Sequence, residues 1–139
     1  MKLVLDTNIL IAALIRDSVT REILLLPQVE FLVSEFVFEE VELHRDEIQR
    51  KSGLPADAFD LLFEMMKQRL VLLPDNEIKH KQEAEAIMKP IDIKDALFIA
   101  IALSEENDGI WSEDKHFEQQ QRVKVWKTKD LIEHFRVKQ

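Results

Sequence analysis

Four acidic residues stand where this sequence could hold a divalent metal ion: Asp6, Glu40, Asp95 and Asp114. Mg²⁺ and Mn²⁺ prefer oxygen ligands such as carboxylates. Four bare carboxylates close together would repel one another and raise one another's pKa values, and a cation removes that repulsion. A metal held in this way lowers the pKa of a bound water and stabilises charge on a phosphate. The chemistry that these residue types support is therefore metal-assisted displacement at phosphate.

Asp6 directly follows the apolar run Leu3–Leu5. A carboxylate at the end of a buried strand is costly unless something uses it. The alternative is a helix N-cap, since Asp is a favoured capping residue. Thr7 or Asn8 could cap the helix equally well.

Glu40 lies in a helix whose inward stripe is predicted by its 3.6-residue periodicity. The stripe comprises Val37, Val41, His44 and Ile48. At about 100° per residue, Glu40 sits roughly 60° from the centre of this stripe, while Glu39 and Glu42 point away. Glu40 is thus the acid of this run best placed to reach the sheet edge. The alternative is a solvated charge beside the core, and the stripe predicts that His44 is packed in the core.

Asp92 and Asp95 open an apolar helix, where acids favour the N-terminus as a cap and as partners of the helix dipole. We expect Asp92 to serve mainly as the cap. Asp95 is expected to be held at the sheet edge, as a metal ligand must be. Asp114 comes third after Trp111, with Glu113 as its rival and a helix cap as the alternative. His116, beside Asp114, is a candidate contact for phosphate or metal.

Alternating strands and helices must position these residues. Strands are predicted at residues 2–5, 29–33, 109–111 and 123–126, with 70–73 either a strand or an extended connector. Helices are predicted at 8–17, 20–26, 35–51 after Ser34 as a cap, 55–69, 76–88, 92–106 and 129–135 after Thr128 as a cap. Such alternation predicts parallel pairing with right-handed crossovers. We therefore expect a Rossmann-like three-layer α/β/α sandwich around a mostly parallel sheet, with ligands at the carboxyl ends of the strands.

The composition excludes several classes of protein. The 139 residues predict one domain spanning 1–139. The absence of cysteine excludes disulfides, zinc–thiolate sites and a cysteine nucleophile. The two glycines, Gly53 and Gly109, stand too far apart for a phosphate-binding loop. We expect a cytoplasmic protein, with no signal peptide and no membrane-spanning segment. The net charge of −8 argues against tight, metal-free binding of nucleic acid.

Four segments, taken together, resemble the PIN-domain nucleases over nearly the whole chain. They are Leu5-Asp6-Thr7-Asn8 after the first strand, Val33-Ser34 followed by Glu40, the run Asp95 to Leu103, and Trp111-Ser112-Glu113-Asp114-Lys115-His116-Phe117. The last segment is similar to the family's Thr/Ser-x-Asp-x-x-Phe pattern. Each segment alone is a weak signal, but their order and spacing are fairly specific.

The resemblance implies a pocket of acids that binds Mg²⁺ or Mn²⁺ and hydrolyses RNA. Asp6, Glu40 and Asp95 match the three principal acids, and Asp114 matches the more variable fourth. Thr7 or Asn8 matches a polar residue that supports the site. His116 stands where many members carry another acid, so one firmly held metal is expected rather than two.

Many small members of this family are toxins that form homodimers and are silenced by a small antitoxin. Others process RNA, and some have lost activity. The first alternative for this chain is a catalytically silent PIN-like module that only binds other proteins. The second is a phosphoacceptor receiver domain, which would need paired acids after the first strand. Asp6 stands alone there, and Lys127 is a poor match for the lysine of such a domain.

Overall fold

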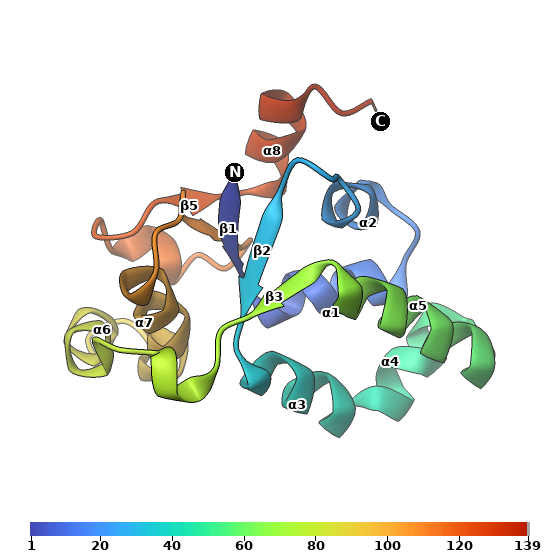
Figure 1. Ribbon diagram of the computed structural model, residues 1–139, viewed down its shortest axis with the longest axis horizontal. Helices are drawn as coiled ribbons and strands as arrows, with labels where there is room; N and C mark the ends of the chain where they lie inside the picture. The colour runs from blue at the N-terminus through green and yellow to red at the C-terminus, as the bar shows by residue number, and fades with distance from the viewer. Residues whose placement is uncertain (139) are drawn as a thin grey trace.

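A five-stranded parallel sheet forms the centre of the computed structural model, which describes residues 1–138 (Figure 1). The strands lie in the order β3-β2-β1-β4-β5. Their bounds are β1 Lys2–Leu5, β2 Glu30–Val33, β3 Leu70–Leu72, β4 Ile110–Trp111 and β5 Val125–Trp126. The predicted α/β architecture with a parallel sheet is confirmed. The segment that was either a strand or a connector is a strand, because Leu70–Leu72 pairs with β2.

Helices cover both faces of the sheet. In Figure 1, α6 and α7 lie on one side of the strands, while α1 and the helices that contact it lie on the other. Within residues 1–138 the α-helices are α1 Thr7–Ile15, α2 Val19–Leu24, α3 Glu35–Leu43, α4 Arg45–Ser52, α5 Ala56–Gln68, α6 Lys81–Met88, α7 Ala96–Ser104 and α8 Thr128–Phe135. None of these helices is both long and apolar enough to cross a membrane.

The helix predicted over 35–51 is in fact two helices, α3 and α4, with a break at His44. The main-chain N–H of His44 closes α3 on the carbonyls of Glu40 and Val41, and Arg45 then opens α4 by pairing with Glu42 and Asp60. The change of direction turns His44 outward, so its predicted place in the core is wrong. The sequence carries neither glycine nor proline at this point and so gives no local signal of a break.

Two further helices begin later than predicted. The segment from residue 76 starts as a short 3₁₀ turn, Asp75–Glu77, and α6 follows only after His80, whose φ is 60°. The segment from residue 92 likewise starts as a 3₁₀ turn, Ile93–Asp95, which leads directly into α7. The second of these turns bears on the site because it presents Asp92 and Asp95 together.

The core lies on both faces of β1, β2 and β4. The apolar residues of β1 are fully buried, and α7 packs against this strand. Residues Phe98–Ile101 of α7 are buried, as the apolar run of this helix predicted. Gly109 precedes β4 with a φ of 132°, and a side chain there would meet the main-chain carbonyl of Lys124. Glycine therefore allows β4 to pair closely with β5.

Candidate metal centre

Asp6 ends the central strand and is held by two neighbours. Its side chain is only 6% exposed. The Ser112 hydroxyl donates to Asp6 Oδ2 at 2.6 Å, and the main-chain N–H of Asn8 donates to Oδ1 at 3.3 Å. Asp6 is therefore the N-cap of α1, as the alternative interpretation held. Capping uses one oxygen, while the other faces the hydroxyl that follows β4, so the cap does not exclude a ligand role.

Serines that directly follow the two neighbouring strands flank Asp6. The β1–β2 and β1–β4 registers, continued past the last paired residues, place Ser34 on one side of Asp6 and Ser112 on the other. Both serines are fully buried. The Ser112 Oγ also accepts from the main-chain N–H of Asp114 at 2.9 Å, so it links two of the predicted acids. Within residues 1–138, the Ser34 hydroxyl is the buried side-chain group without a hydrogen-bond partner, and it does not cap α3.

Glu40 is connected to the same strand end through Thr7. The Thr7 hydroxyl, which is buried, donates to Glu40 Oε1 at 2.8 Å. Thr7 directly follows Asp6, so this hydrogen bond brings the half-buried carboxylate of α3 to the end of β1. Of the two supporting residues expected here, Thr7 contributes its side chain, whereas Asn8 is exposed and contributes its main-chain N–H.

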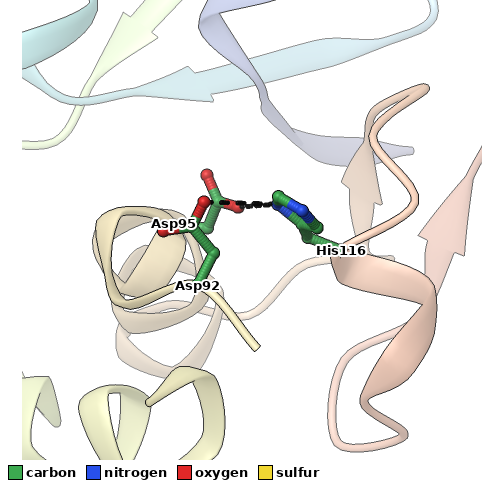
Figure 2. Close-up of side chains that lie close together, drawn as sticks. All are labelled: Asp92, Asp95 and His116. Atoms are coloured by element: carbon green, nitrogen blue, oxygen red, sulfur yellow. Dashed lines mark hydrogen bonds and ion pairs between the residues drawn. The ribbon is translucent and has the colours of Figure 1, made fainter. Parts of the chain in front are cut away.

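Asp92, Asp95 and Asp114 converge on the imidazole of His116. Figure 2 shows the two carboxylates before α7 pointing at the ring, which follows β4. His116 Nδ1 lies 3.1 Å from Asp95 Oδ2, 3.4 Å from Asp92 Oδ2 and 3.4 Å from Asp114 Oδ1. The main-chain N–H of His116 donates to Asp114 Oδ1 at 2.9 Å. Asp92 also caps the 3₁₀ turn, as expected, by accepting from the Lys94 N–H at 3.0 Å.

The electrostatics join these groups into one centre. Burial raises the pKa of Asp6 above its ordinary value of 3.8; the Ser112 hydrogen bond opposes this rise, and the charges of Asp114 and Glu40 add to it. Burial likewise raises the pKa of Asp95, where His116 opposes the rise and the charge of Asp114 adds to it. The charge of Asp114 thus acts both on Asp6, in the half of the centre that contains Glu40, and on Asp95, in the half that contains His116. The hydrogen bond to Asp95 raises the pKa of His116 above its ordinary value of 6.5.

The structure therefore brings all four predicted acids to one edge of the sheet. Glu113, the rival of Asp114, is used elsewhere, since its Oε1 accepts from the Thr128 N–H at 2.6 Å. Beside Asp6 and Asp114 the surface is hollowed by about 380 Å³. The hollow is lined by Asp6, Asn8, Ile9, Ala12, Thr20, Glu113, Asp114 and Thr128. It gives the centre access to a ligand larger than an ion.

Sequence reasoning missed the part that Ser34 plays here. The residue was expected to cap a helix, yet its hydroxyl is buried beside Asp6 without a partner. The available signal was positional: Ser34 and Ser112 each directly follow a strand that neighbours β1.

A divalent cation fits this donor set. Asp92, Asp95 and His116 offer one ligand atom each, and these three atoms lie within 4.8 Å of one another. The carboxylates repel one another, which a cation reverses. A cation bound by these three ligand atoms would neutralise the clustered acids.

The chain was compared with models of known protein families. The model of a family described as "PIN domain" matches residues 4–136, which is nearly the whole chain. Among curated proteins, none matches.

Proposed function

This chain belongs to the PIN-domain family, and on that premise we propose that it is a Mg²⁺- or Mn²⁺-dependent ribonuclease. PIN domains are generally nucleases that depend on divalent metals, so family membership supports a hydrolase with the nuclease-type fold. We assign catalysis and metal binding to Asp6, Glu40, Asp95 and Asp114.

One observation carries this proposal: hydrogen bonds and chain adjacency link the four acids at the carboxyl end of the central strand. Glu40 is bonded to Thr7, the neighbour of Asp6, and Ser112 joins the Asp6 carboxylate to the main-chain N–H of Asp114. The carboxylates of Asp114 and Asp95 then both approach His116 Nδ1. Acids that only solubilise a surface do not need buried donors to hold them in place. Asp6 is buried and the other three acids are partly buried, and like-charge repulsion between them is retained rather than relieved.

The residues of the chain then have separable tasks. Asp6, fixed by Ser112 and the Asn8 N–H, is the rigid central ligand, and Glu40, Asp95 and Asp114 complete the donor set. When bound, a divalent ion supplies the Lewis acid for the phosphate and ionises water at neutral pH. Thr7 keeps Glu40 oriented, and the hollow beside Asp6 leaves room for the nucleotide next to the scissile bond.

RNA as the substrate is consistent with the charge of the chain once metal is included. A net charge of −8 repels a polyanion, so binding of the phosphate must depend on the cation. The proposal therefore requires that RNA binding, as well as cleavage, be lost when metal is removed.

We also propose that the protein is the toxin of a toxin–antitoxin pair, acts as a homodimer and is silenced by a small antitoxin. Family membership supports this role. The outer face of α5 supports self-association, because Leu61 and Met65 are 64% and 48% exposed there. Analytical ultracentrifugation of the wild type and of Leu61→Lys tests the proposed homodimer. A monomeric wild type contradicts the dimer and has no bearing on catalysis.

The decisive experiment compares the wild type with Asp6→Asn and Asp95→Asn. Calorimetric titration with Mn²⁺ measures metal binding, and incubation with pools of RNA and DNA measures cleavage. We expect the wild type to bind Mn²⁺ and to cut RNA, and both variants to lose both properties. Asp17→Asn is the matched control, because its side chain is 85% exposed, and it should behave as the wild type does.

The outcomes separate the alternatives. Metal binding without cleavage of any nucleic acid contradicts the proposed nuclease activity but supports the metal centre. Absence of metal binding contradicts both and favours the silent protein-binding module. Cleavage of DNA alone contradicts the assignment of RNA as substrate.

A further inference from the structure

The second half of the centre differs from the first in containing nitrogen. Around Asp6 and Glu40 the side-chain contacts come from hydroxyl and carboxylate oxygens. On the other side, the carboxylates of Asp92, Asp95 and Asp114 converge on the Nδ1 of His116. Figure 2 shows the first two of them. Among residues 1–138, the group of side chains close enough to hold an ion together is Asp92, Asp95 and His116.

The spacing of these atoms suits ligands that share one ion. An ion with bonds of about 2.1 Å places neighbouring octahedral ligands about 3 Å apart. His116 Nδ1 lies 3.1 Å from Asp95 Oδ2 and 3.4 Å from the nearest oxygens of Asp92 and Asp114. One ring N–H can point at only one of three acceptors, so hydrogen bonding alone leaves two of these approaches unused.

The ring is positioned by its own backbone and remains accessible. The His116 N–H is fixed on Asp114 Oδ1 at 2.9 Å, while the side chain is 42% exposed. An ion can therefore reach Nδ1 without opening the core. Ligation requires the tautomer that carries its proton on Nε2, which the exposed ring can adopt by bonding to water.

We propose that His116 Nδ1 is a metal ligand, shared with Asp92 and Asp95, that makes this centre select Mn²⁺ over Mg²⁺. The inference rests on the proposed metal-dependent function and adds ion selectivity to it. Mg²⁺ favours oxygen ligands and retains its waters, whereas imidazole favours first-row transition ions. An acid at position 116 would give an all-oxygen set, which suits Mg²⁺.

The test measures affinities and coordination rather than activity. Mn²⁺ and Mg²⁺ are titrated separately by calorimetry, at pH 8, into the wild type, His116→Asp and His116→Ala. We expect the preference of the wild type for Mn²⁺ to fall at least about tenfold in both variants, since loss of groups around a metal typically costs that much. His116→Asp should gain Mg²⁺ affinity, and His116→Ala should not. His44→Gln is the control, because His44 is exposed at the α3–α4 break.

Electron spin echo spectroscopy of the Mn²⁺-loaded protein gives a second readout, since a bound imidazole nitrogen modulates the echo. The modulation should be present in the wild type and in His44→Gln and absent in both variants at position 116. Because the wild-type spectrum needs no variant, it decides the matter even if a substitution impairs folding. Mn²⁺ bound without nitrogen modulation overturns this inference alone and leaves the proposed nuclease intact. An unchanged ion preference in His116→Asp overturns it as well. Failure of the wild type to bind Mn²⁺ overturns both.

Discussion

Replacing Ser112 with alanine removes two hydrogen bonds from the middle of the acidic network. The hydroxyl donates to the buried Asp6 carboxylate at 2.6 Å and accepts from the Asp114 N–H at 2.9 Å. The variant leaves Asp6 with the Asn8 N–H as its remaining donor. The Asp6 side chain should then lose its fixed orientation, and its pKa should rise further because the opposing hydrogen bond is gone.

The magnitude follows from the chemistry of the two bonds. A hydrogen bond to a charged group contributes about 1.5–3 kcal/mol, and loss of the acceptor of the partly buried Asp114 N–H adds a smaller amount, so we expect a fall in unfolding free energy of about 2–3 kcal/mol. For 139 residues, the entropy of unfolding is about 0.29 kcal/mol per kelvin. The Tm of the metal-free protein should therefore fall by roughly 7–10 °C. Because Ser112 orients a ligand, the affinity for Mn²⁺ should fall by about 10–100-fold.

Differential scanning calorimetry and Mn²⁺ titration measure the two effects. Ser52→Ala is the matched control, because the Ser52 hydroxyl also donates one hydrogen bond and accepts another, at the end of α4. That variant should lose some stability and keep its Mn²⁺ affinity. If Ser112→Ala binds Mn²⁺ within twofold of the wild type, Ser112 does not orient a ligand, and the network around Asp6 is only structural.

Three other perturbations test separate features. Ser34→Ala removes a buried hydroxyl without a partner, so it should raise the unfolding free energy in urea by about 1 kcal/mol, and a loss of that size would show that the hydroxyl is bonded. The raised pKa values of Asp6 and Asp95 favour the protonated carboxyls in the folded state, so the stability that these two residues contribute is lost as pH rises above 3.8. The pKa of His116 is also raised, so its contribution to stability is present below pH 6.5 and is lost as pH rises through the raised value. The Tm of the metal-free protein should therefore fall between pH 6 and 8, and saturating Mn²⁺ should flatten that slope; a rising Tm would contradict the assignment. Gly109→Ala forces a side chain onto a facing carbonyl at a φ of 132°, so it should cost roughly 3–4 kcal/mol in urea unfolding, and a loss below about 1 kcal/mol would mean that the turn relaxes freely.

The position of Asp6 could be predicted because it depends on local pattern. An apolar run ending in an acid specifies both a buried strand and the residue at its carboxyl end. The buried helix that begins near Asp95 could also be predicted, because polar residues before a long apolar run are typical of a helix N-terminus. These two elements place Asp6 and Asp95 once parallel pairing is assumed.

Features that depend on contacts between distant parts of the chain could not be predicted from the sequence. At the break at His44, the next residue, Arg45, pairs with Asp60, which is 15 residues further along the chain. The link between Thr7 and Glu40 spans 33 residues and follows from packing of α3 against α1. The convergence of Asp92 and Asp114 on His116 depends on how the 3₁₀ turn meets the segment after β4. Periodicity within one element carries no information about such contacts between elements.

The place of β1 between β2 and β4 also has a kinetic consequence. The Ser112–Asp6 hydrogen bond joins residues 106 positions apart, so the ion-binding centre exists only after a large loop has closed. Such long-range pairing slows folding, and an extended chain cannot bring these donors together beforehand. An ion that binds only the native state stabilises it by about 2.7 kcal/mol at a concentration 100 times its Kd. Because the centre closes late, Mn²⁺ should slow unfolding and leave the rate of folding unchanged in stopped-flow measurements.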